Sequence, residues 1–238
     1  MDKLSKRINN IPVYLYNTNK FKSINIRLVF KNYFNKENAT KYSLLTSILS
    51  NTCKKYNTKR KVSNVLDDLY SANIVISTYP IHKTRLTTFN LTIINQKYIN
   101  ENLINKGIEL LKEFILNPNL EDGIFNQKVF EEEKSLLEED LKRIYNNKNK
   151  YAYRQMIKHM CKDEIASVNS NGSLDDLENI TSIDIYDTYL DMINETVFND
   201  NYNKNDNSSS VNYGDGFSIT YDEGVLEEEN KIKKLTKI

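Results

Sequence analysis

The hydrophobic positions change their period along the chain, from the two-residue alternation of strands to the repeat of helices. Within residues 23–30, alternate positions are apolar, which predicts a strand with one buried face. These positions are Ile24, Ile26, Leu28 and Phe30. Similar β-prone segments predict strands at residues 11–16, 74–79 and 86–94.

Two helices interrupt these strands. Apolar residues at helical spacing predict a helix from about Lys41 to Ser50, with Thr40 as its N-cap. After the basic segment 54–59, a second amphipathic helix over residues 62–70 leads directly into the strand at 74–79. The predicted order is therefore helix, short basic loop, helix, strand.

Beyond Ile99 the apolar repeat is helical. It predicts helices at about 99–115, 124–145 and 151–161, and a last helix capped by Thr181. A turn is predicted at residues 171–173. Because strands come first and helices follow, we expect an α+β fold: a mostly antiparallel sheet of about four to six strands with helices packed on one face.

Composition limits the possible functions. The chain has 238 residues, of which 39% are hydrophobic, so one large or two small domains are expected. Its net charge of +1 gives no general attraction to nucleic acid, and the basic cluster at 54–61 reads as a solvated loop. No run is long enough to span a membrane, and the N-terminal residues lack the apolar stretch of a signal peptide. We therefore expect a cytoplasmic protein.

The residues that bind metals most often are scarce. Cys53 and Cys161 are far apart and form no CxxC pair, which fits unpaired thiols in a reducing compartment. The only histidines are His82 and His159, and the spacing of His159 and Cys161 does not match a usual zinc site. No metal and no cofactor are therefore expected.

The segment Thr52-Cys53-Lys54-Lys55-Tyr56, with a helix before it and a helix and a strand after it, resembles the insulinase/pitrilysin family, which includes the mitochondrial processing peptidases. In active members the first helix carries His-x-x-Glu-His, and a Gly-Thr-Lys-Lys-Tyr-like segment follows. The resemblance covers about residues 1–195. It implies a LuxS/MPP-like metallohydrolase half.

The resemblance also implies that the catalytic positions are lost. Counted back from Tyr56, the two histidine positions fall on Ser43 and Ser47, and the glutamate position falls on Thr46. Two imidazoles one helical turn apart bind zinc together with a distant carboxylate, and the glutamate activates the bound water. Serine and threonine hydroxyls stay protonated near neutral pH and are poor zinc ligands. The chain is therefore predicted to be a degenerate, non-catalytic homologue.

In the family, the third zinc ligand is the second acid of a Glu-x6-Glu spacing on a later helix. The acidic run at 131–140 matches that helix, with Glu133 and Asp140, or Glu132 and Glu139, at the corresponding positions. Without the imidazoles, these acids cannot complete a zinc-binding site. A solvated helix face is the simpler interpretation of the run.

By resemblance, the function is that of an inactive subunit. In the family a degenerate chain pairs with an active metallopeptidase subunit, and the two enclose a peptide substrate. Val75, Ile76 and Thr78 match the strand that binds substrate, although ordinary sheet core explains the same residues equally well. Two alternatives remain open: an active hydrolase with a non-standard site, for which no Gly-x-Ser-x-Gly elbow is present, and a truncated, non-functional remnant.

The last part of the chain differs from the rest. Residues 196–238 are polar and low in complexity, which predicts a tail or a truncated continuation after an insulinase-like half at 1–195. Within this part, only residues 217–221 have the pattern of a short strand.

Overall fold

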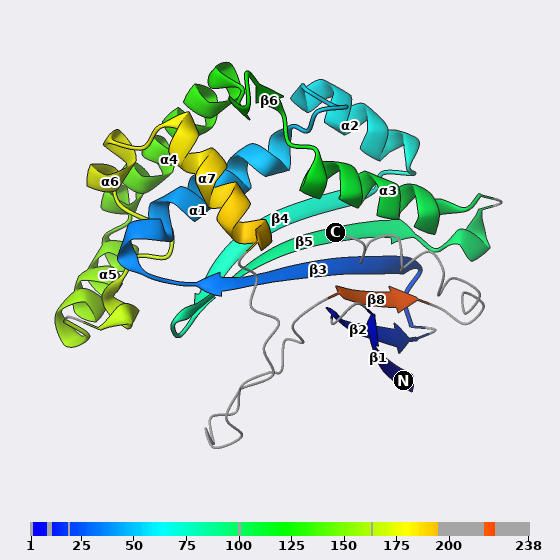
Figure 1. Cartoon of the computed structure of the whole chain (residues 1–238). Helices are drawn as coiled ribbons and strands as arrows, with labels where there is room; N and C mark the ends of the chain where they lie inside the picture. The colour runs from blue at the N-terminus through cyan, green and yellow to red at the C-terminus, as the bar shows by residue number, and fades with distance from the viewer. Residues whose placement is uncertain are drawn as a thin grey trace.

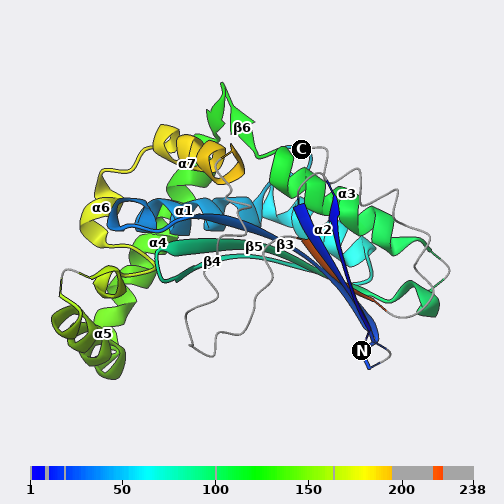
Figure 2. The ribbon, with the colours of Figure 1, turned by 60° about the horizontal axis from the view of Figure 1, so that its bottom comes forward.

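The structure is a computed structural model that describes residues 2–8, 11–18, 20–99, 101–162, 164–194 and 217–221. In this part a six-stranded sheet carries a layer of helices on one face (Figure 1). Figure 2 shows the same two layers from another side. The predicted α+β fold, with a mostly antiparallel sheet covered on one face, is confirmed.

The sheet order is β1-β2-β8-β3-β5-β4. All neighbouring strands are antiparallel except β2 and β8, which are parallel. The strands are β1 (Asp2–Ile8), β2 (Ile11–Asn17), β3 (Ser23–Tyr33), β4 (Asn73–Ile81), β5 (Thr84–Ile94) and β8 (Phe217–Tyr221). Strands β1 and β4 are therefore the two edges of the sheet.

Strand β8 joins the sheet although it comes long after the other strands in the sequence. It lies between β2 and β3, with Phe217 opposite both Val13 and Leu28. The short strand predicted at 217–221 is present, and it belongs to the same sheet as the strands of the first 195 residues. The rest of the predicted tail lies outside the described residues, so the division at residue 195 stays a prediction.

The helices follow the predicted pattern with small shifts. They are α1 (Lys36–Asn51), α2 (Lys59–Asp68), α3 (Leu103–Leu116), α4 (Gln127–Asn146), α5 (Lys148–Met160), α6 (Leu174–Glu178) and α7 (Ser182–Asn194). Sequence analysis missed β1, the short α6, two 3-10 turns at Gln96–Tyr98 and Ile165–Ser167, and the small hairpin of β6 (Leu120–Glu121) and β7 (Ile124–Phe125). Each helix in the described part of the chain is too short or too polar to cross a membrane.

The prediction that Thr40 caps the first helix is wrong. Helix α1 begins one turn earlier, because Asn35 and Asn38 form a reciprocal capping box. Thr40 is instead a buried residue of α1, and its Oγ1 accepts a hydrogen bond from the backbone N–H of Ser173 at 3.2 Å. Gly172, just before Ser173, has a φ of +89° and lies against Thr40. The predicted glycine turn therefore holds α1 in place.

The core lies between the sheet and the helices. Leu44, Leu45 and Leu49 of α1 are fully buried, as are Phe89 and Leu91 of β5. Removing each of these side chains from water contributes roughly 1.5–3 kcal/mol to folding. This core holds α1 as the central helix. Polar residues of α1 contact the loop before α6 on one side and strand β4 on the other.

Candidate functional site

The predicted catalytic positions share one face of α1. Ser47 is four residues from Ser43 and three from Ser50, and Thr46 is three residues from Ser43 and four from Ser50, so the four side chains share one face of the helix. This is the arrangement in which His-x-x-Glu-His presents its ligands and its base. The structure therefore brings Ser43, Thr46 and Ser47 together, as the sequence predicted, but it supplies only hydroxyl groups.

Several of these hydroxyls bond to backbone carbonyls. Thr46 is buried, and its Oγ1 donates to carbonyl oxygens of its own helix, 3.0 Å away. The Oγ of Ser43 lies 3.4 Å from the carbonyl oxygen of Ser170, and that of Ser50 donates to the Thr46 carbonyl at 2.6 Å. These bonds satisfy the hydroxyls within the helix and its neighbouring loop. None of them can act as the carboxylate base of the active enzymes.

Asp140, the predicted third ligand position, is turned to solvent. Its side chain is 67% exposed and forms an ion pair with Arg143, 3.0 Å away. Glu133, seven residues earlier on α4, is instead buried and lies 3.0 Å from the amine of Lys59. The two acids therefore do not act together, and the buried one already has a cation as its partner.

Zinc does not fit this set of donors. The two histidine positions carry hydroxyls, and the acid on α4 that is buried faces a lysine. In the described part of the chain, no three His, Cys, Asp or Glu side chains form a group that could hold a metal ion. Both cysteines are free, and burial raises the pKa of the Cys53 thiol.

Strand β4 lies beside this face of α1. The hydroxyl of Ser50 is 3.4 Å from the carbonyl oxygen of Ile76, which links this face to the strand. Ile76 pairs with the buried Phe89, so it points toward the helices, whereas Val75 is 43% exposed on the opposite face. Within the described residues, β5 is the single strand paired with β4.

Comparison with known proteins identifies the architecture. No protein-family model matches the chain. Over 195 residues it is 27% identical to the "Probable inactive metalloprotease YmfF" of Bacillus subtilis (strain 168), and the match covers 81% of this chain and 46% of that protein. The chain therefore spans about half the length of this curated relative.

Two crystal structures have the same fold. A conserved protein from Enterococcus faecalis V583 superposes with a TM-score of 0.83 at 22% identity, covering 99% of this chain and 52% of the other. A peptidase M16 inactive domain from Pseudomonas fluorescens superposes with a TM-score of 0.71 at 11% identity, covering 100% and 50%. The chain has the fold of one insulinase-like half. The resemblance found in the sequence is confirmed, and the curated relative is itself named as a probable inactive metalloprotease.

A fully buried charge in β5 was missed by sequence analysis. Arg85 of β5 is fully buried, and its guanidinium lies 4.6 Å from the ring centre of Phe34 and 5.1 Å from that of Tyr42. Burial lowers the pKa of Arg85 to about 10. Arg85 donates to Oγ1 of Thr78 at 3.1 Å, so Thr78, a predicted substrate residue, already has a partner inside the protein.

A sequence signal for Arg85 exists. In a strand, every second residue faces the same side. Arg85 has the same parity in β5 as the buried Phe89 and Leu91, so the alternation places it on the helix-covered face.

Proposed function

We propose that this insulinase-like half is a non-catalytic subunit that pairs with an active insulinase-family chain and helps to hold a peptide substrate. The observation that carries the proposal is the combination of a degenerate α1 with an edge strand beside it. Helix α1 keeps the position and the helical spacing of a catalytic helix but offers hydroxyls alone. Strand β4 is an edge strand of the sheet, which supports the addition of a peptide strand there.

The composition of β4 supports peptide capture. Edge strands usually carry charged residues that prevent pairing with other chains. The nine residues of β4 include no charged side chain. Pro80 has no N–H to donate, so pairing is favoured along the first part of the strand.

The peptide would be held mainly through its backbone. Ile76 and Thr78 are directed toward the helix layer, and Val75 is exposed on the other face of the sheet. A peptide added as a further strand contacts the backbone groups of β4, and side chains contribute less. We therefore propose low sequence selectivity at this edge.

The proposal also covers the partner of this chain and its cellular compartment. Relatives of about twice the length match this chain over half of their own length, which supports an assembly with a second, similar half. We propose that an active subunit provides it. The two free cysteines support the cytoplasm as the compartment.

Peptide capture has a direct test in solution. A labelled, unstructured peptide that binds the full chain is compared with the same peptide N-methylated at alternate residues. Because N-methylation removes backbone donors and leaves the side chains in place, we expect binding to fall at least about tenfold. The matched control is N-methylation at the other alternate set, which faces away from β4. Equal binding of all three peptides, measured by fluorescence anisotropy, would rule out strand addition.

The partner can be sought separately. The tagged chain, expressed in its native cells, should co-purify with a protein that carries an intact His-x-x-Glu-His helix, as identified by mass spectrometry. The matched control is a variant with Val75→Lys and Ser77→Lys, which tests whether capture depends on β4. Recovery of the chain alone at native expression levels would contradict the paired-subunit proposal.

A further inference from the structure

A buried cation without a counter-charge lies on the helix-covered face of the sheet. Arg85, the second residue of β5, is fully buried. Burial lowers its pKa to about 10, which is still well above neutral pH, so the guanidinium stays positively charged. Among the described residues, no aspartate or glutamate forms an ion pair with Arg85. Because an uncompensated charge inside a protein is strongly destabilising, a counter-charge is expected.

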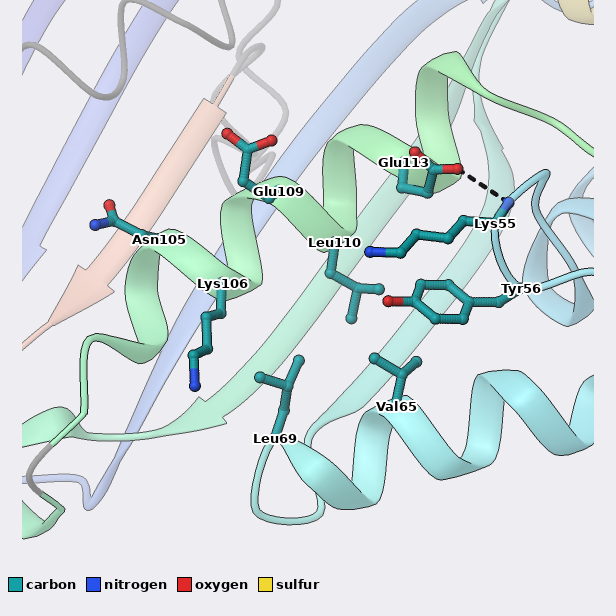
Figure 3. Close-up of a pocket in the computed structure, with 9 residues that line it drawn as sticks. All are labelled: Lys55, Tyr56, Val65, Leu69, Asn105, Lys106, Glu109, Leu110 and Glu113. Carbon is teal, nitrogen blue, oxygen red and sulfur yellow. Dashed lines mark hydrogen bonds between the residues drawn. The ribbon is translucent and has the colours of Figure 1, made fainter.

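Charged residues elsewhere in the molecule show how such groups are usually accommodated. At the pocket between α2 and α3, Lys55, Lys106 and Glu109 are exposed, so water solvates their charges (Figure 3). Glu133 is buried, but the amine of Lys59 lies 3.0 Å from its carboxylate. The guanidinium of β5 has neither solvent nor a charged partner.

The surroundings of this guanidinium leave one of its edges for an anion. Its central carbon lies 4.6 Å from the ring centre of Phe34 and 5.1 Å from that of Tyr42. Nη1 donates to Oγ1 of Thr78 at 3.1 Å, whereas Nε and Nη2 are buried and have no hydrogen-bond partner. These two nitrogens share one edge of the guanidinium, and their N–H groups point the same way. That edge is the fork with which arginine binds anions.

The neighbour of Arg85 in the sheet is neutral. Asn32 of β3 lies directly opposite Arg85. Its Nδ2 donates to the backbone carbonyls of Asp191 and Met192 on α7, and its Oδ1 is buried without a partner. A water molecule shared by Asn32 and Arg85 would satisfy these hydrogen-bonding groups, but the positive charge would stay uncompensated. The charge therefore favours an anion over water at the fork.

We propose that the edge of Arg85 formed by Nε and Nη2 binds one chloride ion inside the core, between β5 and α1. A monatomic ion accepts both N–H groups and needs little more room than a water molecule. Because chloride is monovalent, it balances the single charge of the guanidinium, whereas a divalent anion would leave one negative charge in excess. The site does not depend on the proposed function, since it uses neither the free backbone groups of β4 nor a partner chain.

Thermal unfolding of the full chain tests the proposal. Sodium chloride is raised from about 10 to about 500 mM in exchange for sodium gluconate, so that the ionic strength and the screening stay constant. Gluconate is too large for the enclosed fork. Because an ion that binds only the folded state stabilises it by mass action, we expect the midpoint of unfolding to rise by at least about 3 °C. An unchanged midpoint, which is the result expected for bound water, would overturn the proposal.

Matched variants locate the site. Arg85→Met removes the charge and the donors but keeps a long side chain, so its midpoint should not depend on chloride. Arg60→Met is the control, because Arg60 is exposed on α2, and it should show the full shift of the wild-type chain. Since salts also act on the exposed surface, the readout is the difference between the two variants. A chloride-dependent shift that persists in Arg85→Met would contradict the proposal.

A measurement on the wild-type chain covers the case in which Arg85→Met does not fold. Bromide replaces chloride in such sites and scatters X-rays anomalously. Crystals soaked in sodium bromide should therefore show an anomalous peak within hydrogen-bond distance of Nε and Nη2 of Arg85. Anomalous peaks confined to the surface of the protein would overturn the proposal.

Discussion

The three altered residues of the degenerate site differ in how firmly the protein holds them. Thr46 is buried and donates to carbonyls of its own helix, and Ser43 lies within hydrogen-bond distance of the loop before α6. Ser47 is half-buried, and its backbone carbonyl accepts a hydrogen bond from Asn51. Loss of the ligands has therefore left an ordinary, well-packed helix. The catalytic chemistry is removed while the packing of α1 is preserved.

Gly172 is the residue at which we expect the greatest sensitivity to a small substitution. Its φ of +89° is unfavourable for other residues, and an added Cβ would lie 2.6 Å from the Cα of Thr40. Gly172→Ala should lower the free energy of unfolding by about 3 kcal/mol, measured by urea denaturation.

Gly123→Ala is the matched control for this prediction. Gly123 has a similar φ of +83°, but no atom lies within 4 Å of the added Cβ. Gly123→Ala should lower the free energy of unfolding by only about 1 kcal/mol. Equal effects of the two substitutions would show that the contact of Gly172 with α1 is unimportant.

At the scale of single residues, the sequence predicts which face of a helix a side chain occupies better than it predicts which other elements surround that side chain. Helical spacing alone places Ser43, Thr46 and Ser47 on one face, because the period of a helix is fixed. The same spacing could not show that Asp140 is exposed while Glu133 is buried, since that depends on which neighbours pack against each turn of α4. The burial of Arg85 depends on Phe34 and Tyr42, which lie far from it in sequence.

Among the helices and strands, local sequence patterns predicted where each element lies, but they did not predict which distant strands pair. The strands predicted at 23–30 and 86–94 and the long helices follow from periodicity, although their ends differ by several residues in the structure. The place of β8 could not be predicted, because its partners β2 and β3 precede it by about 190 residues or more in the chain. The first strand was missed because its residues, DKLSKRI, are mostly polar.

The N-terminus of α7 gives a pH-dependent prediction. Asp184 accepts hydrogen bonds from the side chain and the backbone N–H of Thr181, and it also pairs with Lys41; these contacts lower the pKa of Asp184 below its ordinary value. Because the pKa is lower in the folded state, the stabilisation is present above the unfolded pKa, near 3.9, and is lost as the pH falls through the folded value.

Asp184→Asn should therefore flatten the fall in stability between about pH 5 and pH 3, measured by thermal unfolding. Asp187→Asn, at an exposed position on the same helix, is the control and should keep the wild-type slope. An unchanged slope in Asp184→Asn would show that the cap does not contribute.

At the scale of the whole molecule, the chain spans about half the length of its relatives. Its relatives extend to about twice the matched length, and its uncharged edge strand β4 lies next to the degenerate helix. The holding and partnering role that we propose depends on surfaces and not on bound zinc, so a retained fold without a zinc site is compatible with it. Cooperative unfolding of the full chain would argue against a non-functional remnant.

The central claim is that this half does not bind catalytic zinc, and zinc content is its most direct test. The purified chain, incubated with zinc and then dialysed, is measured by elemental mass spectrometry beside a variant with Ser43→His, Thr46→Glu and Ser47→His. We predict far less than one zinc per wild-type chain and no cleavage of peptides. The variant should gain only weak zinc binding, because Asp140 faces solvent and Glu133 faces Lys59. One tightly bound zinc per wild-type chain, together with peptide cleavage, would contradict the account.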